Sequence, residues 1–157
     1  MKSWLKTVHI NQVGHLRAAA YYTQLSRTIG LIVVVLSAVT SASAFSSLNS
    51  SNNQVVLAAV GIISLIATLF SSVQAFLNYP DLASKHQTAG LNYSKLRRWV
   101  EETLVCTTVA LELKDKMDEI RRQIDKLDAE SPVLTQSFFN QGLKIVDSEL
   151  AKLRGVK

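Results

Sequence analysis

Residues 28–80 set the architecture of this chain, and they read TIGLIVVVLSAVTSASAFSSLNSSNNQVVLAAVGIISLIATLFSSVQAFLNYP. These 53 consecutive residues contain no Lys, Arg, Asp, Glu or His. The whole chain has 157 residues, of which 18% are charged. A soluble domain of this length has too little other chain to cover such a long uncharged segment. The composition therefore indicates a membrane protein, and it excludes a disordered chain, a disulfide scaffold and a collagen-like repeat.

Two apolar runs lie inside this stretch, at residues 29–48 and 55–77. As helices they would be about 30 and 35 Å long, enough to cross a hydrocarbon core of about 30 Å. The link Asn49–Gln54 is polar, uncharged and typical of a turn. We therefore expect a two-helix transmembrane hairpin over 29–77. Two other interpretations stay open: a signal peptide ending near Ala42-Ser43-Ala44, and a pair of buried helices in a soluble core.

Basic residues flank the two runs and are absent from the link between them. They are Lys2, Lys6, Arg17 and Arg27 before the first run, and Lys85, Lys95, Arg97 and Arg98 after the second. Because positive charge accumulates on the cytoplasmic side of membrane proteins, both termini are expected in the cytoplasm. The sequence thus predicts a multi-pass protein of the inner, cytoplasmic membrane.

The remaining chain has a helical pattern, so the predicted fold class is an all-α membrane protein. Residues 1–28 are expected to form an amphipathic cytoplasmic helix, and residues 78–157 a cytoplasmic helical stalk. Within the stalk, apolar residues at heptad spacing predict one long helix over 82–129 that packs along a single seam. Ser131-Pro132 marks a break, after which a helix over 133–153 folds back on the long helix or on a neighbouring subunit. Because one seam needs a partner, we expect a coiled-coil homo-oligomer.

Residues 15–27 partly repeat at residues 86–98, an offset of 71. Five of the 13 positions are identical, and they are a His, an Ala, a Tyr, a Leu and an Arg. One copy leads into the first run and the other leads out of the second. Chance similarity between two basic amphipathic helices is one explanation. The other is that the two segments pack side by side beneath the bilayer.

Each apolar run carries a stripe of small and hydroxyl-bearing residues at helical spacing. The first stripe includes Ser37 and Ser41, and the second includes Ser64, Thr68 and Ser71. Small faces and hydroxyls suit close packing between membrane helices. Alternatively, the stripes line a water-filled pathway in an oligomer, and such a pathway would select ions weakly because it has no charged ring. We favour the second run as the lining helix.

The sequence has few features of an enzyme. It lacks a phosphate-cradling glycine-rich loop, a zinc-protease helix and a nucleophile elbow. We therefore expect no catalytic residues, no cofactor, no bound metal and no small-molecule substrate. His86 and Asp81 alone are too few for a metal site, so His86 is expected to pack or to form a pH-sensitive hinge. Cys106 lies on the apolar seam and is expected to be a small buried hydrophobe.

A basic cluster with an aromatic neighbour follows the second run, at Lys95, Arg97, Arg98 and Trp99. Clusters at this position usually contact anionic lipid headgroups. Contact with a partner that carries nucleic acid is the other interpretation.

The residues around the second run resemble those of a known family. They are Pro80, His86, Gly90, Tyr93, Leu96 and Arg97, in the pattern P-x5-H-x3-G-x2-Y-x2-L-R. Ahead of the first run stand Arg17, Ala18, Tyr22, Leu25 and Arg27. With the two-span hairpin, this pattern resembles the SLATT family, the SMODS- and SLOG-associating two-transmembrane effector domains of prokaryotes. The resemblance covers about residues 10–150, and we expect a stand-alone form without a fused sensor domain.

The resemblance implies an effector of anti-phage or other conflict systems, of the kind that forms membrane pores when a linked sensor fires. It also implies a separately encoded sensor, which would be a nucleotide-second-messenger or a reverse-transcriptase type. The leading hypothesis is therefore an oligomeric effector that permeabilises the membrane. A non-conducting anchor that recruits a soluble partner through residues 82–157 is the alternative. A constitutive coiled-coil membrane organiser is a third.

Overall fold

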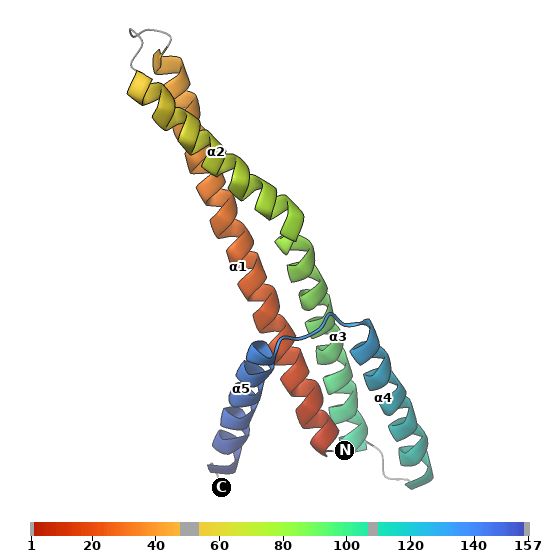
Figure 1. The fold of residues 1–157 in the computed structure, drawn as a ribbon. Coiled ribbons are helices and arrows are strands. Elements are labelled where there is room, and N and C mark those ends of the chain that lie inside the picture. The colour runs from red at the N-terminus through yellow and green to blue at the C-terminus, as the bar shows by residue number, and fades with distance from the viewer. Residues whose placement is uncertain (1, 48–53, 107–109, 156–157) are drawn as a thin grey trace. The chain divides into compact units, whose positions relative to one another are not determined.

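The computed structural model describes residues 2–47, 54–106 and 110–155, and these residues form five helices and no strand (Figure 1). The helices are α1 (Lys2–Ser47), α2 (Gln54–Leu77), α3 (Tyr79–Cys106), α4 (Ala110–Glu130) and α5 (Gln136–Gly155). They belong to two compact units. The hairpin unit is Tyr22–Asp81, and the stalk unit combines Met1–Tyr21 with Leu82–Lys157. The predicted all-α class, with two long apolar helices and further helices that pack back, is confirmed.

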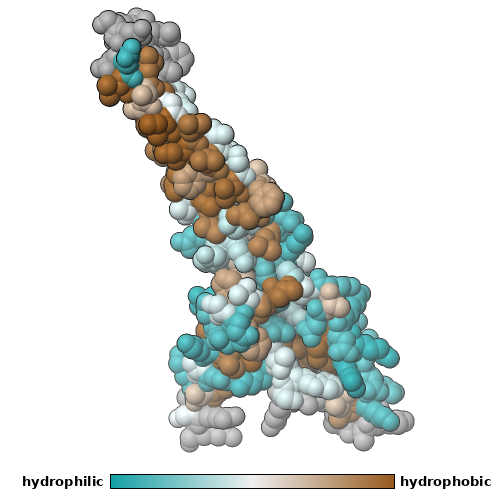
Figure 2. Space-filling view, in the orientation of Figure 1, coloured by the Kyte–Doolittle hydropathy of each residue, from teal (hydrophilic) through white to brown (hydrophobic). Residues whose placement is uncertain are grey.

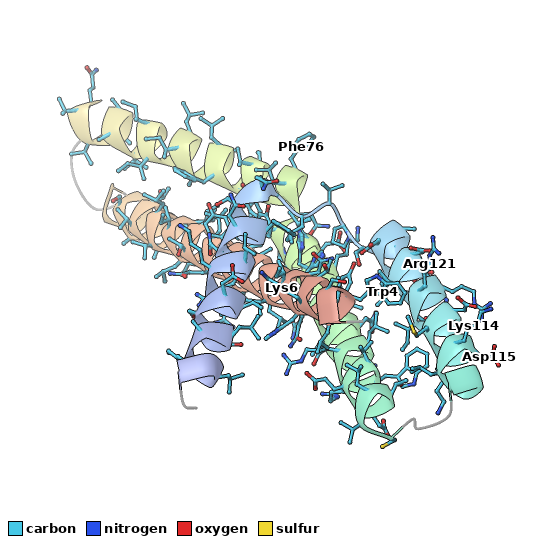
Figure 3. All side chains as sticks on the ribbon, turned by 90° about the horizontal axis from the view of Figure 1, so that it is seen from below. Trp4, Lys6, Phe76, Lys114, Asp115 and Arg121 are labelled. Atoms are coloured by element: carbon cyan, nitrogen blue, oxygen red, sulfur yellow. The ribbon has the colours of Figure 1, made fainter. Side chains whose placement is uncertain are left out.

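The apolar parts of α1 and α2 are long enough and apolar enough to cross a membrane, and no residue of either apolar window is buried. Figure 2 shows hydrophobic surface gathered over α2, and Phe76 on that helix is 88% exposed and projects away from it (Figure 3). Core helices of a soluble protein would instead be covered by other parts of the chain. Exposed apolar helices of this length are what a lipid environment accommodates.

Asn78 separates α2 from α3. Its φ is 41°, in the left-handed region that Asn tolerates better than most residues. Its backbone N–H donates to the Gln74 carbonyl at 3.2 Å, and its own carbonyl accepts from the Asp81 N–H at 3.1 Å. Pro80 and Asp81 then occupy the first turn of α3, where a missing N–H and a negative charge both suit a helix start. The second apolar run therefore ends at a sharp, locally encoded turn.

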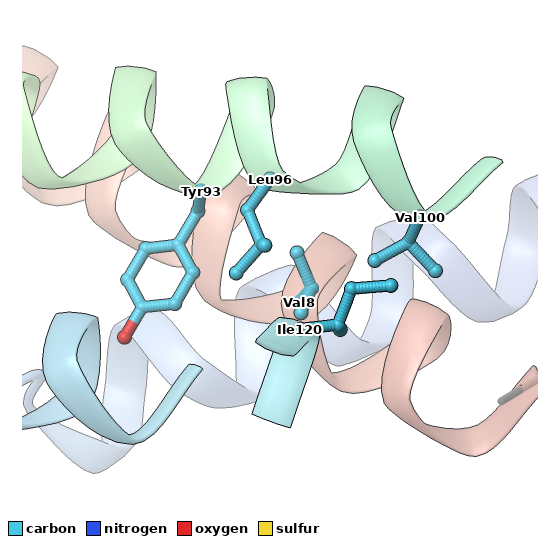
Figure 4. Packing of buried hydrophobic residues seen from close by; sticks show 5 residues of the cluster. All are labelled: Val8, Tyr93, Leu96, Val100 and Ile120. Atoms are coloured by element: carbon cyan, nitrogen blue, oxygen red, sulfur yellow. The ribbon is translucent and has the colours of Figure 1, made fainter. Parts of the chain in front are cut away.

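The stalk unit has a hydrophobic core contributed by three helices. Val8 from α1, Leu96 and Val100 from α3, and Ile120 from α4 are buried against one another, together with Tyr93 (Figure 4). Part of the apolar seam predicted for a single long helix, including Leu96 and Ile120, is therefore buried within one chain. This burial requires that α4 reverses direction and packs against α3.

The prediction of one continuous helix over 82–129 is wrong. Helix α3 ends at Cys106 and α4 begins at Ala110. The intervening sequence, Thr107-Thr108-Val109, is β-branched throughout and has low helix propensity. A heptad seam is equally satisfied when the helix folds back on itself, so the seam does not require a second subunit. The predicted burial of Cys106 is also wrong, since Cys106 is exposed.

The C-terminal helix folds back, as predicted, but its partner is α1. It begins at Gln136 rather than at residue 133, and the Thr135 carbonyl accepts from the Phe138 and Phe139 N–H groups at 3.0 and 3.1 Å. Gly142 of α5 lies against the backbone of α1 at Ile10. The Nζ of Lys6, labelled in Figure 3, is 2.7 Å from the Asp147 carboxylate.

The core predicts a difference between two valines of α3. Val100→Ala should lower the free energy of unfolding by about 2 kcal/mol, because Val100 is fully buried and its lost methyl groups leave a cavity. Val105→Ala is the matched control, since Val105 is 82% exposed, and it should change stability by less than about 0.5 kcal/mol. Thermal unfolding of the full chain in detergent, followed by circular dichroism, measures both. Equal effects of the two substitutions would contradict this core.

Candidate functional site

The two predicted hydroxyl stripes meet only in part. Ser37 of α1 and Thr68 and Ser71 of α2 line one groove of about 400 Å³ within the hairpin unit. Ser41 and Ser64 are not among the residues that line it. Both runs therefore present hydroxyls toward a common groove, over a shorter length than the stripes read from the sequence.

Several hydroxyls along these helices, including that of Thr68 in the groove, bond to the backbone of their own helix. The Thr68 hydroxyl donates to the Ser64 carbonyl at 2.9 Å, and the Ser64 hydroxyl donates to the Val60 carbonyl at 2.8 Å. On α1, the Ser41 hydroxyl donates to the Ser37 carbonyl at 2.9 Å. Such back-bonding satisfies the hydroxyl proton without water and leaves an oxygen lone pair that can still accept a hydrogen bond. These positions can therefore face either a neighbouring helix or water.

The motif residues that follow the second run divide into exposed and buried positions. Pro80 is exposed, whereas His86, Gly90, Tyr93 and Leu96 are buried in the stalk unit. Most of the motif is therefore the face of α3 that packs inside the stalk unit.

Gly90 shows why this face needs a small residue. A Cβ at this position would lie 2.8 Å from the Leu16 side chain and 3.3 Å from the Leu16 backbone nitrogen. Helices α1 and α3 therefore approach too closely for a side chain at residue 90.

The partial repeat at an offset of 71 corresponds to a direct contact. The Nδ1 atoms of His15 and His86, which occupy the same position in the two copies, are 2.9 Å apart. The packing is antiparallel: Gln12 meets Arg97, while Val8 lies beside Leu96 and Val100. The two copies therefore meet near their N-terminal ends, where His15 and Leu16 lie against His86 and Gly90. The expectation that they pack side by side along their length is wrong, because the antiparallel arrangement carries the rest of residues 15–27 and 86–98 away from each other.

The two histidines form a buried, neutral pair. Each is 3% exposed, and the contact between their Nδ1 atoms requires one protonated and one unprotonated nitrogen. Burial, helped by the neighbouring His86, lowers the pKa of His15 to about 4. Burial also lowers the pKa of His86. A second proton on the pair would break the hydrogen bond and place like charges in the interior.

Tyr93 connects this pair to α4. Its ring stacks on His15 with a centroid separation of 5.5 Å, and its hydroxyl donates to the Asp128 carboxylate. Burial and the bond to Asp128 raise the pKa of Tyr93 well above its usual value. The polar network of His15, His86, Tyr93 and Asp128 therefore ties α1, α3 and α4 together.

Sequence reasoning missed two members of this network. Asp128 has the spacing of a solvated charge on a polar helix face, so nothing in the sequence singles it out. His15 was visible as the repeat partner of His86, and that shared position was the available signal. Among the residues that the structure describes, no group of three or more His, Cys, Asp or Glu side chains could hold a metal ion.

The predicted basic cluster does not form a single patch. The Arg97 guanidinium is half-buried, with its Nε 3.1 Å from Glu101 and its Nη1 3.4 Å from Gln12. Lys95 and Trp99 line a hollow between α3 and α4. Arg98 is exposed and does not line that hollow.

Comparison with known proteins matches most of the chain to one protein family. The model of the family described as SMODS and SLOG-associating 2TM effector domain family 4 matches residues 6–137. No curated protein and no solved structure matches the chain. The match covers α1 to α4 and stops just after α5 begins.

Proposed function

The chain belongs to the SMODS and SLOG-associating 2TM effector domain family 4, and from this premise we propose that it is an oligomeric effector of prokaryotic anti-phage defence that permeabilises the cytoplasmic membrane. Domains of this family are two-transmembrane effector domains associated with SMODS and SLOG defence systems. The family and the two candidate spans together indicate a membrane protein. Pore formation, oligomerisation and the trigger are the steps that we add.

The exposed hairpin with its hydroxyl groove carries this proposal. Apolar surface covers both spans, so they suit lipid or other copies of the hairpin. Ser37, Thr68 and Ser71 supply a polar strip within that apolar surface. In an oligomer such strips would line an uncharged pathway that conducts with weak selectivity.

The positive-inside pattern supports an orientation with the stalk unit in the cytoplasm. There a separately encoded sensor, of a nucleotide-second-messenger or reverse-transcriptase type, would reach it. The proposed activity makes and breaks no covalent bond, so the chain acts without being an enzyme.

Substitution in the groove tests the proposal. Thr68→Leu with Ser71→Leu should abolish the entry of a membrane-impermeant dye into cells that express the chain with its sensor, because Leu fills the strip and removes both hydroxyls. Ala59→Leu adds a leucine at an exposed position of α2 outside the groove and should leave dye entry unchanged. Membrane fractionation checks that all variants are inserted equally.

A non-conducting anchor is the second candidate, because the stalk unit has a hydrophobic core of its own. In that case protection against phage would survive the double Leu substitution and no dye would enter. If the double Leu variant still protects cells against phage while their membranes stay intact, the pore hypothesis is wrong and the anchor hypothesis is favoured.

A further inference from the structure

A hollow of about 570 Å³, lined by both polar and apolar side chains, lies between α3 and α4 in the stalk unit. Its polar lining consists of Ser84, Lys85, Thr88 and Asn92 on α3, with Glu130 and Ser131 at the end of α4. A second hollow of about 520 Å³ adjoins it and shares Asn92 and Glu130. The two hollows form one groove along α3, separate from both the hairpin groove and the buried histidine pair.

The lining of the first hollow suits an anion with several oxygen atoms. Lys85 offers an ammonium group, Ser84, Thr88 and Ser131 offer hydroxyls, and Asn92 offers an amide. Glu130 is the one carboxylate among these side chains, and its Oε1 lies 3.8 Å from the Lys126 Nζ, so a cation balances it. An ammonium group with several hydroxyl donors is a combination that recognises phosphate.

The hollow is near the second candidate span in the sequence. Lys85 is the seventh residue of α3, which begins two residues after the end of α2, so about 10 Å of helix precedes it. The headgroup layer on each side of a bilayer is about 5–8 Å thick. A lysine side chain extends about 6 Å toward its polar tip and can therefore reach the inner edge of this layer.

We propose that this hollow binds the phosphate of an anionic phospholipid headgroup and so attaches α3 and α4 to the membrane surface. The proposal rests on the proposed function only in requiring that α2 spans the membrane. It requires neither a pore nor a trigger.

Binding of a short-chain lipid to the purified full chain in detergent tests the proposal. The probe is dihexanoyl phosphatidylglycerol, and the signal is Trp fluorescence, because Trp99 lines the adjoining hollow. Lys85→Gln should weaken binding about fivefold, since one basic side chain at an anionic lipid contributes about this much. Arg122→Gln is the matched control: it removes the same charge from an exposed position of α4 outside both hollows and should change the dissociation constant less than twofold.

A second variant guards against indirect effects, because Lys85 has a further interaction in the folded chain. Thr88→Val keeps the charge and the side-chain shape but removes a hydroxyl, and it should weaken binding at least twofold with an unchanged circular dichroism melt. Equal losses in Lys85→Gln and Arg122→Gln would overturn the proposal, because they would mean diffuse surface attraction. Inorganic phosphate that displaces the lipid at equal concentration would also overturn it, in favour of a site for free phosphate. This test does not use dye entry in cells, so a failure of the lipid-binding proposal can be distinguished from a failure of the pore proposal.

Discussion

Replacing Gly142 by Ala is expected to detach α5 from α1. A Cβ at Gly142 would lie 2.6 Å from the Ile10 carbonyl oxygen and 3.1 Å from the Gly14 nitrogen. Both atoms belong to the backbone of α1, so no side-chain rotation can relieve the overlap, and the helices must separate. Overpacking of this kind costs about 1–3 kcal/mol. Separation would also remove the contacts of Lys6 with Asp147 and of His9 with Glu149.

Hydrogen exchange of the full chain, read by mass spectrometry over residues 136–155, measures this detachment. The amides of α5 should exchange at least tenfold faster in Gly142→Ala than in the unmodified chain. Gly155→Ala is the control on the same helix, because a Cβ there meets nothing within 4 Å. Both substitutions gain helix propensity, so the difference between them isolates the clash. Unchanged exchange in Gly142→Ala would mean that α5 does not pack on α1 in this way.

The buried histidine pair is expected to make the stalk unit less stable in acid. Because the pKa of His15 in the folded chain lies below the ordinary histidine value of 6.5, the unfolded chain binds protons more readily between pH 6.5 and about 4. The stabilisation is therefore present above pH 6.5 and is lost as the pH falls through this interval. That interval corresponds to about 3 kcal/mol for His15 alone, at 1.36 kcal/mol per pH unit.

Thermal unfolding between pH 7.5 and pH 4.5 measures this loss. The groups that face the pair are Tyr93 on α3 and, through its hydroxyl, Asp128 on α4. Substituting Asn for both His15 and His86 keeps polar groups that can hydrogen-bond but removes both titrating rings. This double variant should lose much less stability than the unmodified chain over the same pH range. An identical pH dependence in the two proteins would show that carboxylates elsewhere, and not the histidine pair, are responsible.

The membrane-related part of the fold could be predicted because lipid constrains composition so strongly. A segment as long as residues 28–80 without a charge leaves few alternatives to a pair of spans. The end of α2 was also encoded locally, by Asn78 and Pro80. The way in which helices pack against one another has no such local signal in the sequence. Ile120 fits a heptad seam equally well in a long helix and in one that reverses, so periodicity could not separate the two.

The sequence indicated which kinds of residue form the candidate site, but not which of them lie together. Ser37, Thr68 and Ser71 do meet in one groove, but Ser41 and Ser64 lie outside its lining because only part of each stripe faces the partner helix. The pairing of Gly142 with Ile10 could not be foreseen, because a glycine in a helix does not indicate which backbone approaches it. The repeat at an offset of 71 placed His15 and His86 at equivalent positions, which was a signal for the histidine pair. The link from this pair through Tyr93 to Asp128 depends on where α4 packs, and the sequence does not indicate that.

The proposed function requires that activation of this chain opens the cytoplasmic membrane. The most direct measurement follows the membrane potential and the growth of single cells together after the chain and its sensor are activated. Depolarisation and dye entry should precede growth arrest, and Thr68→Leu with Ser71→Leu should prevent all three. Growth arrest in cells whose membranes stay polarised and impermeable to the dye would contradict it.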